Sequence, residues 1–361
     1  MPPVRYWNVF SGTPAEPVAP PWRLGDADHC EYLVGPAFFD PQVNGFAGVD
    51  FQDPDVSSAA LEHAVDALRR AGCAHILLTL ITNADDFFVD QLRRISEMLA
   101  RSASLRGCIL GFHLEGPFIS EKEGYVGAHP ARYVRDPQWD LFQRWQQAAG
   151  GRIRMLSLAP ERPGSIDFIR RAADAGVCVC LAHTDASLDT LVEAAEAGAS
   201  WATHLGNGCP GLMQRHDNVV QRILAVPQLN ATLIPDLIHV PHPALGNLVR
   251  QLGPARVAFT TDSVSAAGAP PGRYRLGELE VVVGSDRVVL HPSGKGFAGS
   301  GLTMVEGFFN VVRLGGLDAA GAWRGWTRLR GQLFPQVEAP RAAAPWSAAA
   351  AAAALPRQGT P

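Results

Sequence analysis

A histidine and a glutamate follow a short apolar run in the segment His113-Leu-Glu-Gly-Pro-Phe118. The run before them, residues 108–112, has the composition of a buried strand. Because burial makes an isolated charge costly, a carboxylate at the end of such a strand is normally paired or bound to a metal ion. Glu115 therefore needs partners from elsewhere in the chain.

Other polar residues follow the later apolar runs. His183 and His204 come directly after two of these runs, and Asp262 comes after the last one. Two histidines and a carboxylate form the three-residue ligand set of a catalytic zinc site. A bound ion of this kind activates water near neutral pH, and Asp262 is then a candidate for proton transfer. His113 is a candidate to support Glu115 from outside the ligand set.

Each of these residues also has an ordinary structural explanation. A single histidine at a strand end is more often a satisfied structural residue, and an aspartate before a serine is more often a turn residue. His75, inside a predicted strand, is interpreted as structural. The joint occurrence of Glu, His, His and Asp on four strands favours a metal-dependent active site. Further polar residues at or near strand ends are Gln42, Asn44, Glu161 and His239.

The elements that must bring these residues together alternate between short apolar strands and amphipathic helices. The predicted strands cover residues 34–43, 73–80, 108–114, 153–158, 177–182, 200–205, 230–234 and 256–261. This α/β pattern predicts a (β/α)8 TIM-type barrel, whose active site lies at the carboxyl ends of the strands. A doubly wound open sheet is the alternative, but no glycine-rich phosphate motif follows the first strand.

Three regions differ in composition. Residues 1–33 are rich in proline and aromatic residues and are interpreted as loops with one or two short strands, a separate N-terminal part of a small β domain if they pair with other strands. Residues 34–315 form the predicted hydrolase barrel, with a β-hairpin insert at 272–291 and a last helix at 300–314. Residues 316–361 form an atypical tail rich in Ala, Arg and Pro, with no convincing strand pattern.

The composition excludes several classes of protein. Hydrophobic residues make up 47% of the 361 residues and charged residues 18%, which allows a large core. The net charge of −4 gives no electrostatic support for nucleic-acid binding. No apolar run of about 18 residues and no signal core occur, so we expect a cytoplasmic protein that does not bind membranes. The six cysteines form no CxxC pair and are interpreted as reduced thiols.

Together these motifs resemble the N-acetylglucosamine-6-phosphate deacetylase family of the amidohydrolase superfamily. The matching segments are 36–45, 113–118, 127–129, 182–184, 203–208, 261–262 and 298–304. The resemblance implies hydrolysis of the N-acetyl group of N-acetylglucosamine 6-phosphate or a related amino sugar, giving acetate and an amino sugar phosphate. The alternatives are an amidohydrolase acting on another N-acyl or cyclic amide substrate and a non-catalytic barrel.

The resemblance also implies roles for individual residues. Glu115, His183 and His204 bind one divalent metal ion, with zinc favoured over iron, cobalt or manganese. Asp262 is the general acid/base and His129 contacts the substrate amide, so these two are the expected catalytic residues. A homodimer is expected. The remaining site positions are expected to bind substrate: Gln42, Asn44, Asn207, Gly208, Arg215, His239 and Ser300.

The sequence departs from the family pattern in its substrate loop and in its tail. Gln42 and Asn44 replace the His-x-His of two-metal amidohydrolases, as in single-metal deacetylases. The loop after the sixth strand reads His204-Leu-Gly-Asn-Gly-Cys-Pro, where the family usually has His-Leu-Phe-Asn-Ala-Met. Arg215, the candidate phosphate ligand, therefore lies in an altered setting. The resemblance also implies a small β-sandwich beside the barrel. The composition changes after Leu317, so the tail does not resemble the family's C-terminus, and this sandwich is expected to be incomplete. A shifted reading frame is one explanation.

Overall fold

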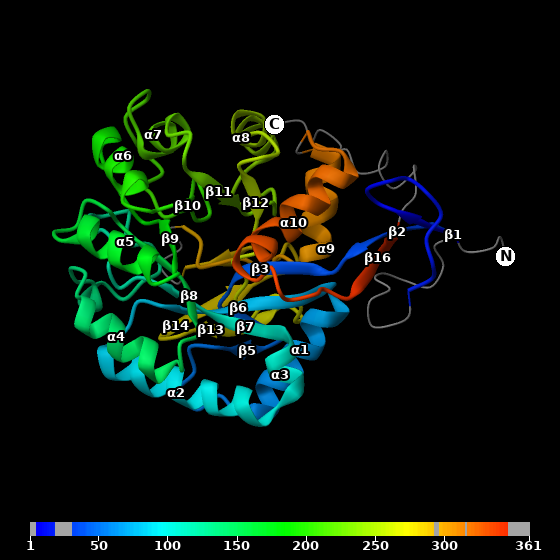
Figure 1. The fold of residues 1–361 in the computed structure, drawn as a ribbon, viewed down its shortest axis with the longest axis horizontal. Helices are drawn as coiled ribbons and strands as arrows, with labels where there is room; N and C mark the ends of the chain where they lie inside the picture. The colour runs from blue at the N-terminus through cyan, green and yellow to red at the C-terminus, as the bar shows by residue number, and fades with distance from the viewer. Residues whose placement is uncertain (1–4, 19–30, 292–295, 315, 346–361) are drawn as a thin grey trace.

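A computed structural model describes residues 5–18, 31–291, 296–314 and 316–345 of the chain. Eight parallel strands form one sheet, which curves into a nearly closed barrel with helices outside it (Figure 1). The predicted TIM-type barrel is confirmed. Its strands, in chain order, are β3 (Phe38–Val43), β6 (Cys73–Ile81), β7 (Ile109–Glu115), β8 (Ile153–Leu158), β9 (Cys178–Leu181), β10 (Trp201–Ala202), β11 (Asn230–Leu233) and β12 (Val257–Phe259).

Helices cover the outside of the barrel. They are α1 (Ser58–Arg70), α2 (Asp85–Arg101), α3 (Ala103–Cys108), α4 (Trp139–Ala148), α5 (Ser165–Asp174), α6 (Leu188–Glu196), α7 (Val219–Ala225), α8 (His242–Leu252) and α9 (Met304–Leu314), with a 3-10 turn η1 (Ala131–Tyr133). Ser57, Ser187 and Asn218 cap α1, α6 and α7 by accepting backbone N–H bonds. The buried faces of these helices and of the strands form the main hydrophobic core.

The strand predicted at 34–43 is two strands in the structure. β2 (Glu31–Pro36) ends at Pro36, and β3 begins at Phe38. β2 pairs with β1 (Arg5–Asn8) and β16 (Arg341–Pro345) in a separate three-stranded sheet, on the right in Figure 1. Proline has no backbone N–H to donate to a ladder, so the chain leaves one sheet and enters the next at this point.

A small antiparallel sheet lies between β12 and α9 in the sequence. It consists of β13 (Gly272–Leu276), β14 (Leu279–Val283) and β15 (Val289–Leu290), and occupies the position of the expected hairpin insert. Its apolar face packs against Ile81, the last residue of β6, and against Val264, which follows β12. A two-stranded ribbon of β4 (Gly45–Phe46) and β5 (Val49–Asp50) follows β3. Both additions lie at the carboxyl ends of the barrel strands.

The C-terminal region contains a helix and a strand that its composition does not indicate. α10 (Ala319–Leu333) packs on β3 and β12, with the Trp323 ring centroid 4.8 Å from that of Phe38 and the Trp326 centroid 5.7 Å from that of Phe259. The expectation of no strand in this region is wrong, because β16 pairs with β2. Its alanine-rich sequence has little strand propensity, so pairing supplies the structure. A run of seven alanines at residues 348–354 lies outside the described residues.

Gly325→Ala tests whether α10 packs on the barrel in this way. A Cβ at Gly325 would lie 2.4 Å from Cε2 of Phe259. We expect the variant to lose about 1–3 kcal/mol of unfolding free energy through overpacking, measured by urea unfolding. Gly331→Ala is the matched control in the same helix, because nothing lies within 4 Å of its Cβ. The control should gain stability, since alanine favours helix. Equal gains in both variants would contradict this packing.

Two further expectations can be compared with the described part of the chain. No helix there is both long and apolar enough to span a membrane. Five of the six cysteines are described, and all five are free thiols. The sixth, Cys30, lies outside the described residues.

Candidate active site

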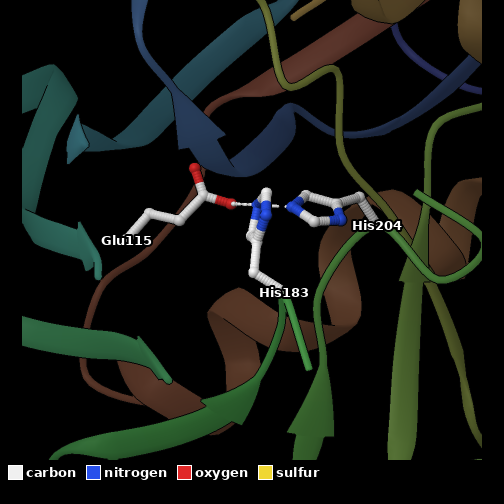
Figure 2. Close-up of side chains that lie close together, drawn as sticks. All are labelled: Glu115, His183 and His204. Carbon is white, nitrogen blue, oxygen red and sulfur yellow. Dashed lines mark hydrogen bonds and ion pairs between the residues drawn. The ribbon is translucent and has the colours of Figure 1, made fainter. Parts of the chain in front are cut away.

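Glu115, His183 and His204 lie together at the carboxyl end of the barrel (Figure 2). Glu115 ends β7, and the histidines follow β9 and β10. Oε1 of Glu115 is 3.3 Å from Nε2 of His183 and 2.7 Å from Nε2 of His204. All three side chains are buried. One ligand atom from each lies within 4.8 Å of the others, so the structure brings the predicted ligand set together.

The orientation of the His183 ring suits a metal ligand. Its Nδ1 lies 2.6 Å from the backbone carbonyl oxygen of Tyr125. A carbonyl oxygen only accepts hydrogen bonds, so Nδ1 is a donor and Nε2 is the ring nitrogen that faces Glu115 and would bind a metal ion. Metal-bound histidines are commonly oriented by a backbone carbonyl in this way. Together with Glu115 and His204, this donor set fits a divalent ion such as zinc.

The charge of Glu115 is stabilised by its two histidine neighbours. Burial alone raises the pKa of Glu115, but the hydrogen bonds from His183 and His204 outweigh it and hold this pKa well below its usual value. Burial likewise lowers the pKa of His204, but the Glu115 carboxylate outweighs burial and raises it. A metal ion would compensate the same buried carboxylate, and its binding would require His204 to give up its proton.

Three site residues have a backbone conformation that side chains disfavour. The φ angles of His183, His204 and Asp262 are 49°, 36° and 49°. The left-handed region costs a non-glycine residue roughly 1–2 kcal/mol. Such strain persists only where the surrounding structure enforces it, which is common at functional sites. Half of the six described non-glycine residues with positive φ belong to this cluster.

Asp262 has the properties of a general acid/base. It follows β12, and its Oδ1 accepts a hydrogen bond of 2.8 Å from Nδ2 of Asn44. Burial, with a contribution from the charge of Glu115, raises the pKa of Asp262 to about 7. A carboxyl group with a pKa near neutral can take up and return a proton at physiological pH.

His129 presents a hydrogen-bond donor to the same site. Its Nδ1 accepts the backbone N–H of Thr82 at 3.3 Å, so the ring proton is on Nε2. Nε2 lies 3.7 Å from Oε2 of Glu115. Burial lowers the pKa of His129 to about 3, so the ring is neutral. His129 is therefore placed to donate to an oxygen atom without carrying a charge.

His113 does not support Glu115, and that prediction is wrong. Its Nδ1 lies 3.1 Å from the carbonyl oxygen of Pro41, and its Nε2 lies 2.7 Å from Oγ of Ser157. His113 and Glu115 are two positions apart along β7, so their side chains project on the same face at different heights. His113 thus joins β7 to the neighbouring strand β8 and the end of β3.

Gln42 and Asn44 carry buried polar atoms without partners. Among the residues that the structure describes, both side-chain amide atoms of Gln42 and Oδ1 of Asn44 have no hydrogen bond. Leaving such buried groups unpaired costs roughly 1–3 kcal/mol each. A bound molecule with complementary donors and acceptors would pair them, which suits the predicted role of both residues in substrate binding.

The loop after β10 packs its first residues on the ligand histidines. Nδ2 of Asn207 donates to the carbonyl oxygen of His204 at 3.1 Å. A Cβ on Gly208 would lie 2.9 Å from Nδ1 of His183, so only glycine allows this approach. Arg215 lies farther along the loop and is exposed. The structure does not bring Arg215 into contact with the other predicted site residues.

His239 and Ser300 are positioned by neighbours near Asp262. Nδ1 of His239 lies 2.6 Å from Oδ2 of Asp236, and its ring centroid lies 4.5 Å from that of Phe297. The Ser300 hydroxyl donates to the carbonyl oxygen of Thr261 at 2.5 Å. Ser300 therefore supports the end of β12, and its predicted contact with substrate stays a prediction.

Sequence reasoning missed the groups that orient the site residues. The Tyr125 carbonyl and the Thr82 backbone N–H bond Nδ1 of His183 and of His129 and so orient the two rings, and any residue type offers those backbone groups. Glu161 accepts hydrogen bonds from the Thr184 hydroxyl and the Asp185 N–H. It thereby holds the loop after β9, and its position after β8 was the only signal for it.

Several known proteins are similar to this chain in amino-acid sequence. No protein-family model matches the chain. The N-acetylglucosamine-6-phosphate deacetylase of Bacillus subtilis (strain 168) is 36% identical over 275 residues, 75% of this chain and 68% of that protein. The N-acetylgalactosamine-6-phosphate deacetylase of Escherichia coli O157:H7 is 32% identical over 292 residues, 80% of this chain and 75% of that protein.

A solved structure agrees with these relatives. It is a mutant N-acetyl-D-glucosamine-6-phosphate deacetylase from Mycobacterium smegmatis in complex with N-acetyl-D-glucosamine 6-phosphate. The two structures superpose with a TM-score of 0.78 at 27% identity, covering 91% of this chain and 87% of the other. Sequence and structure thus agree over most of the chain, which belongs to the N-acetylglucosamine-6-phosphate deacetylase family.

Proposed function

We propose that this chain is a metal-dependent amide hydrolase that removes the acetyl group of N-acetylglucosamine 6-phosphate or a closely related amino sugar phosphate. The observation that carries the proposal is the buried cluster of Glu115, His183 and His204 with Asp262 nearby. Membership of the deacetylase family supports the choice of an N-acetyl amino sugar as substrate.

Glu115, His183 and His204 would hold one divalent ion, and zinc is our proposal among zinc, iron, cobalt and manganese. When bound, such an ion polarises the acetyl carbonyl and favours the ionised form of water. The family relationship supports a homodimer. The free thiols of the described cysteines support a reducing, cytoplasmic location.

The remaining chemistry falls to residues of the chain. Asp262 takes a proton from the attacking water and then delivers it to the departing amine nitrogen, as a general base and acid. Asn44 keeps the Asp262 carboxylate in one orientation through its hydrogen bond. His129 donates its Nε2 proton in a hydrogen bond to the oxygen that becomes negative in the transition state. The unpaired amide of Gln42 is available to the sugar or its acetamide group.

Acetate release tests the proposed function directly. The purified metal-loaded protein is given N-acetylglucosamine 6-phosphate, N-acetylgalactosamine 6-phosphate and N-acetylglucosamine, and acetate is measured. We expect preference for a 6-phosphate sugar. Equal turnover with and without phosphate would shift the proposal to another N-acyl substrate, in line with the exposed position of Arg215. No acetate from any of the three would overturn it.

The pH dependence of kcat/KM should show an acid limb set by Asp262. The carboxyl group must be ionised to accept a proton, so activity rises as pH increases through its pKa. Burial raises that pKa to about 7, and a bound cation would lower it, so the limb should lie below about pH 7. Asn44→Ala should move the limb to higher pH, because the Asn44 hydrogen bond lowers this pKa.

Metal content measured across the same pH range controls for loss of the ion. Protonation of the ligand histidines also removes activity at low pH, but it does so by releasing metal. A profile that is flat from about pH 5 to pH 9 in fully loaded protein would contradict the role of Asp262.

A further inference from the structure

The barrel is joined most weakly between β3 and β12. These two strands are the first and the last in the order of the eight-stranded sheet. In the described structure no ladder of backbone hydrogen bonds joins them. Beyond them, the Asn44 N–H donates to the Ser263 carbonyl oxygen at 2.8 Å, and Val43 forms an isolated bridge with Ser263. Asp262 lies directly at this seam, so its position depends on what holds the two strands together.

A buried carboxylate crosses the same seam. Asp40, on β3, is fully buried. Its Oδ1 accepts the Thr260 hydroxyl at 2.6 Å, and its Oδ2 accepts the Thr261 hydroxyl at 2.5 Å and the Thr261 N–H at 3.1 Å. The Gln42 N–H also donates to Oδ1, at 3.2 Å. One carboxylate thus holds two successive residues of the opposite strand end.

We propose that Asp40 is a positioning residue for Asp262, an inference that rests on the proposed function. Asp40 fixes the backbone at Thr261, the residue immediately before Asp262. Four residues after Asp40, Asn44 fixes the Asp262 carboxylate itself. The same short segment of chain therefore holds both the main chain and the side chain of the general acid/base. This double hold maintains the left-handed conformation of Asp262.

The hydrogen bonds of Asp40 require an acceptor at both oxygens. An amide in place of the carboxylate keeps the shape but turns one acceptor into a donor. That donor would face either the Thr260 hydroxyl or the Thr261 hydroxyl and N–H. We therefore expect Asp40→Asn to loosen the end of β12 without touching the metal ligands, since none of Asp40's bonds reaches Glu115, His183 or His204.

The test compares kinetics, metal content and structure of Asp40→Asn with those of a matched control. Asp85→Asn is the control, because Asp85 is a half-buried acid on α2 that accepts the Trp145 indole N–H, outside the site. We expect Asp40→Asn to lose about 10- to 100-fold in kcat, the scale of an angstrom-level misplacement, with KM and metal content unchanged. The acid limb of its pH dependence of kcat/KM should shift, whereas Asp85→Asn should keep wild-type kinetics.

Further measurements keep the proposal falsifiable. If Asp40→Asn does not fold, Thr260→Val removes one donor to the carboxylate and should lower kcat in the same direction. A crystal structure of either variant should show the Asn44–Asp262 hydrogen bond, 2.8 Å here, lengthened. Wild-type kcat and an unchanged pH profile in the folded variant would overturn the proposal. If the wild-type protein releases no acetate, the proposed function fails, and the crystal structure still decides the role of Asp40.

Discussion

Asp262→Asn should reduce kcat/KM for deacetylation by about 100- to 10,000-fold, the usual contribution of a general acid/base. Asparagine keeps the size of the side chain, but it cannot accept a proton from water or return one to the amine. The burial that raises the pKa of Asp262 to about 7 is what makes the native carboxyl group suitable for both steps. Acetate release by the variant, at saturating and limiting substrate, measures the loss.

The control for this variant is its metal content and substrate affinity. Asp262 is not among the three residues whose ligand atoms cluster, so Asp262→Asn should bind one metal ion as the wild-type protein does. The hydrogen bond from Asn44 Nδ2 can be kept by the new side-chain oxygen. Full activity in a metal-loaded Asp262→Asn protein would remove Asp262 from the mechanism. Loss of both metal and activity would make it a structural residue.

The barrel could be predicted because its strands are buried on both faces and appear as short apolar runs between amphipathic helices. The exchange of sheets at Pro36 was missed, because residues 32–39 form one apolar run that crosses from β2 into β3. β16 was missed for a different reason. Its residues Arg341–Pro345 have no strand pattern of their own and are extended because β2 offers an unpaired edge.

The clustering of Glu115, His183 and His204 could be predicted because strand ends in a barrel meet at one face, so residue type and position were enough. The orientation of His183 could not be predicted, since it depends on the carbonyl group of Tyr125 in a separate loop. His113 was misassigned because strand spacing gives the face of a side chain and not its height in the barrel. The contacts of Asp40 with Thr260 and Thr261 join the first and the last strand of the barrel. No local sequence pattern predicts contacts between residues so far apart in the chain.

Glu115→Gln should abolish metal binding at the proposed site. The variant keeps the shape of the side chain and removes the only carboxylate among the three clustered residues. Loss of groups outside the ligand set typically costs 10- to 100-fold in metal affinity, so loss of the charged ligand should cost more than about 100-fold. Equilibrium dialysis with zinc measures this affinity, and acetate release should fall in parallel.

The same variant separates metal binding from folding. In the wild-type protein Glu115 compensates His204, whose pKa it raises against the effect of burial. The glutamine side chain of the variant carries no charge, so it no longer raises the pKa of His204. His204 therefore stays neutral down to a lower pH than in the wild-type protein, and the variant contains no buried unpaired charge at the site. We therefore expect Glu115→Gln to fold and to unfold cooperatively while binding no zinc. A variant that binds zinc with wild-type affinity would show that the ion lies elsewhere, because neutral glutamine is a poor replacement for a carboxylate ligand.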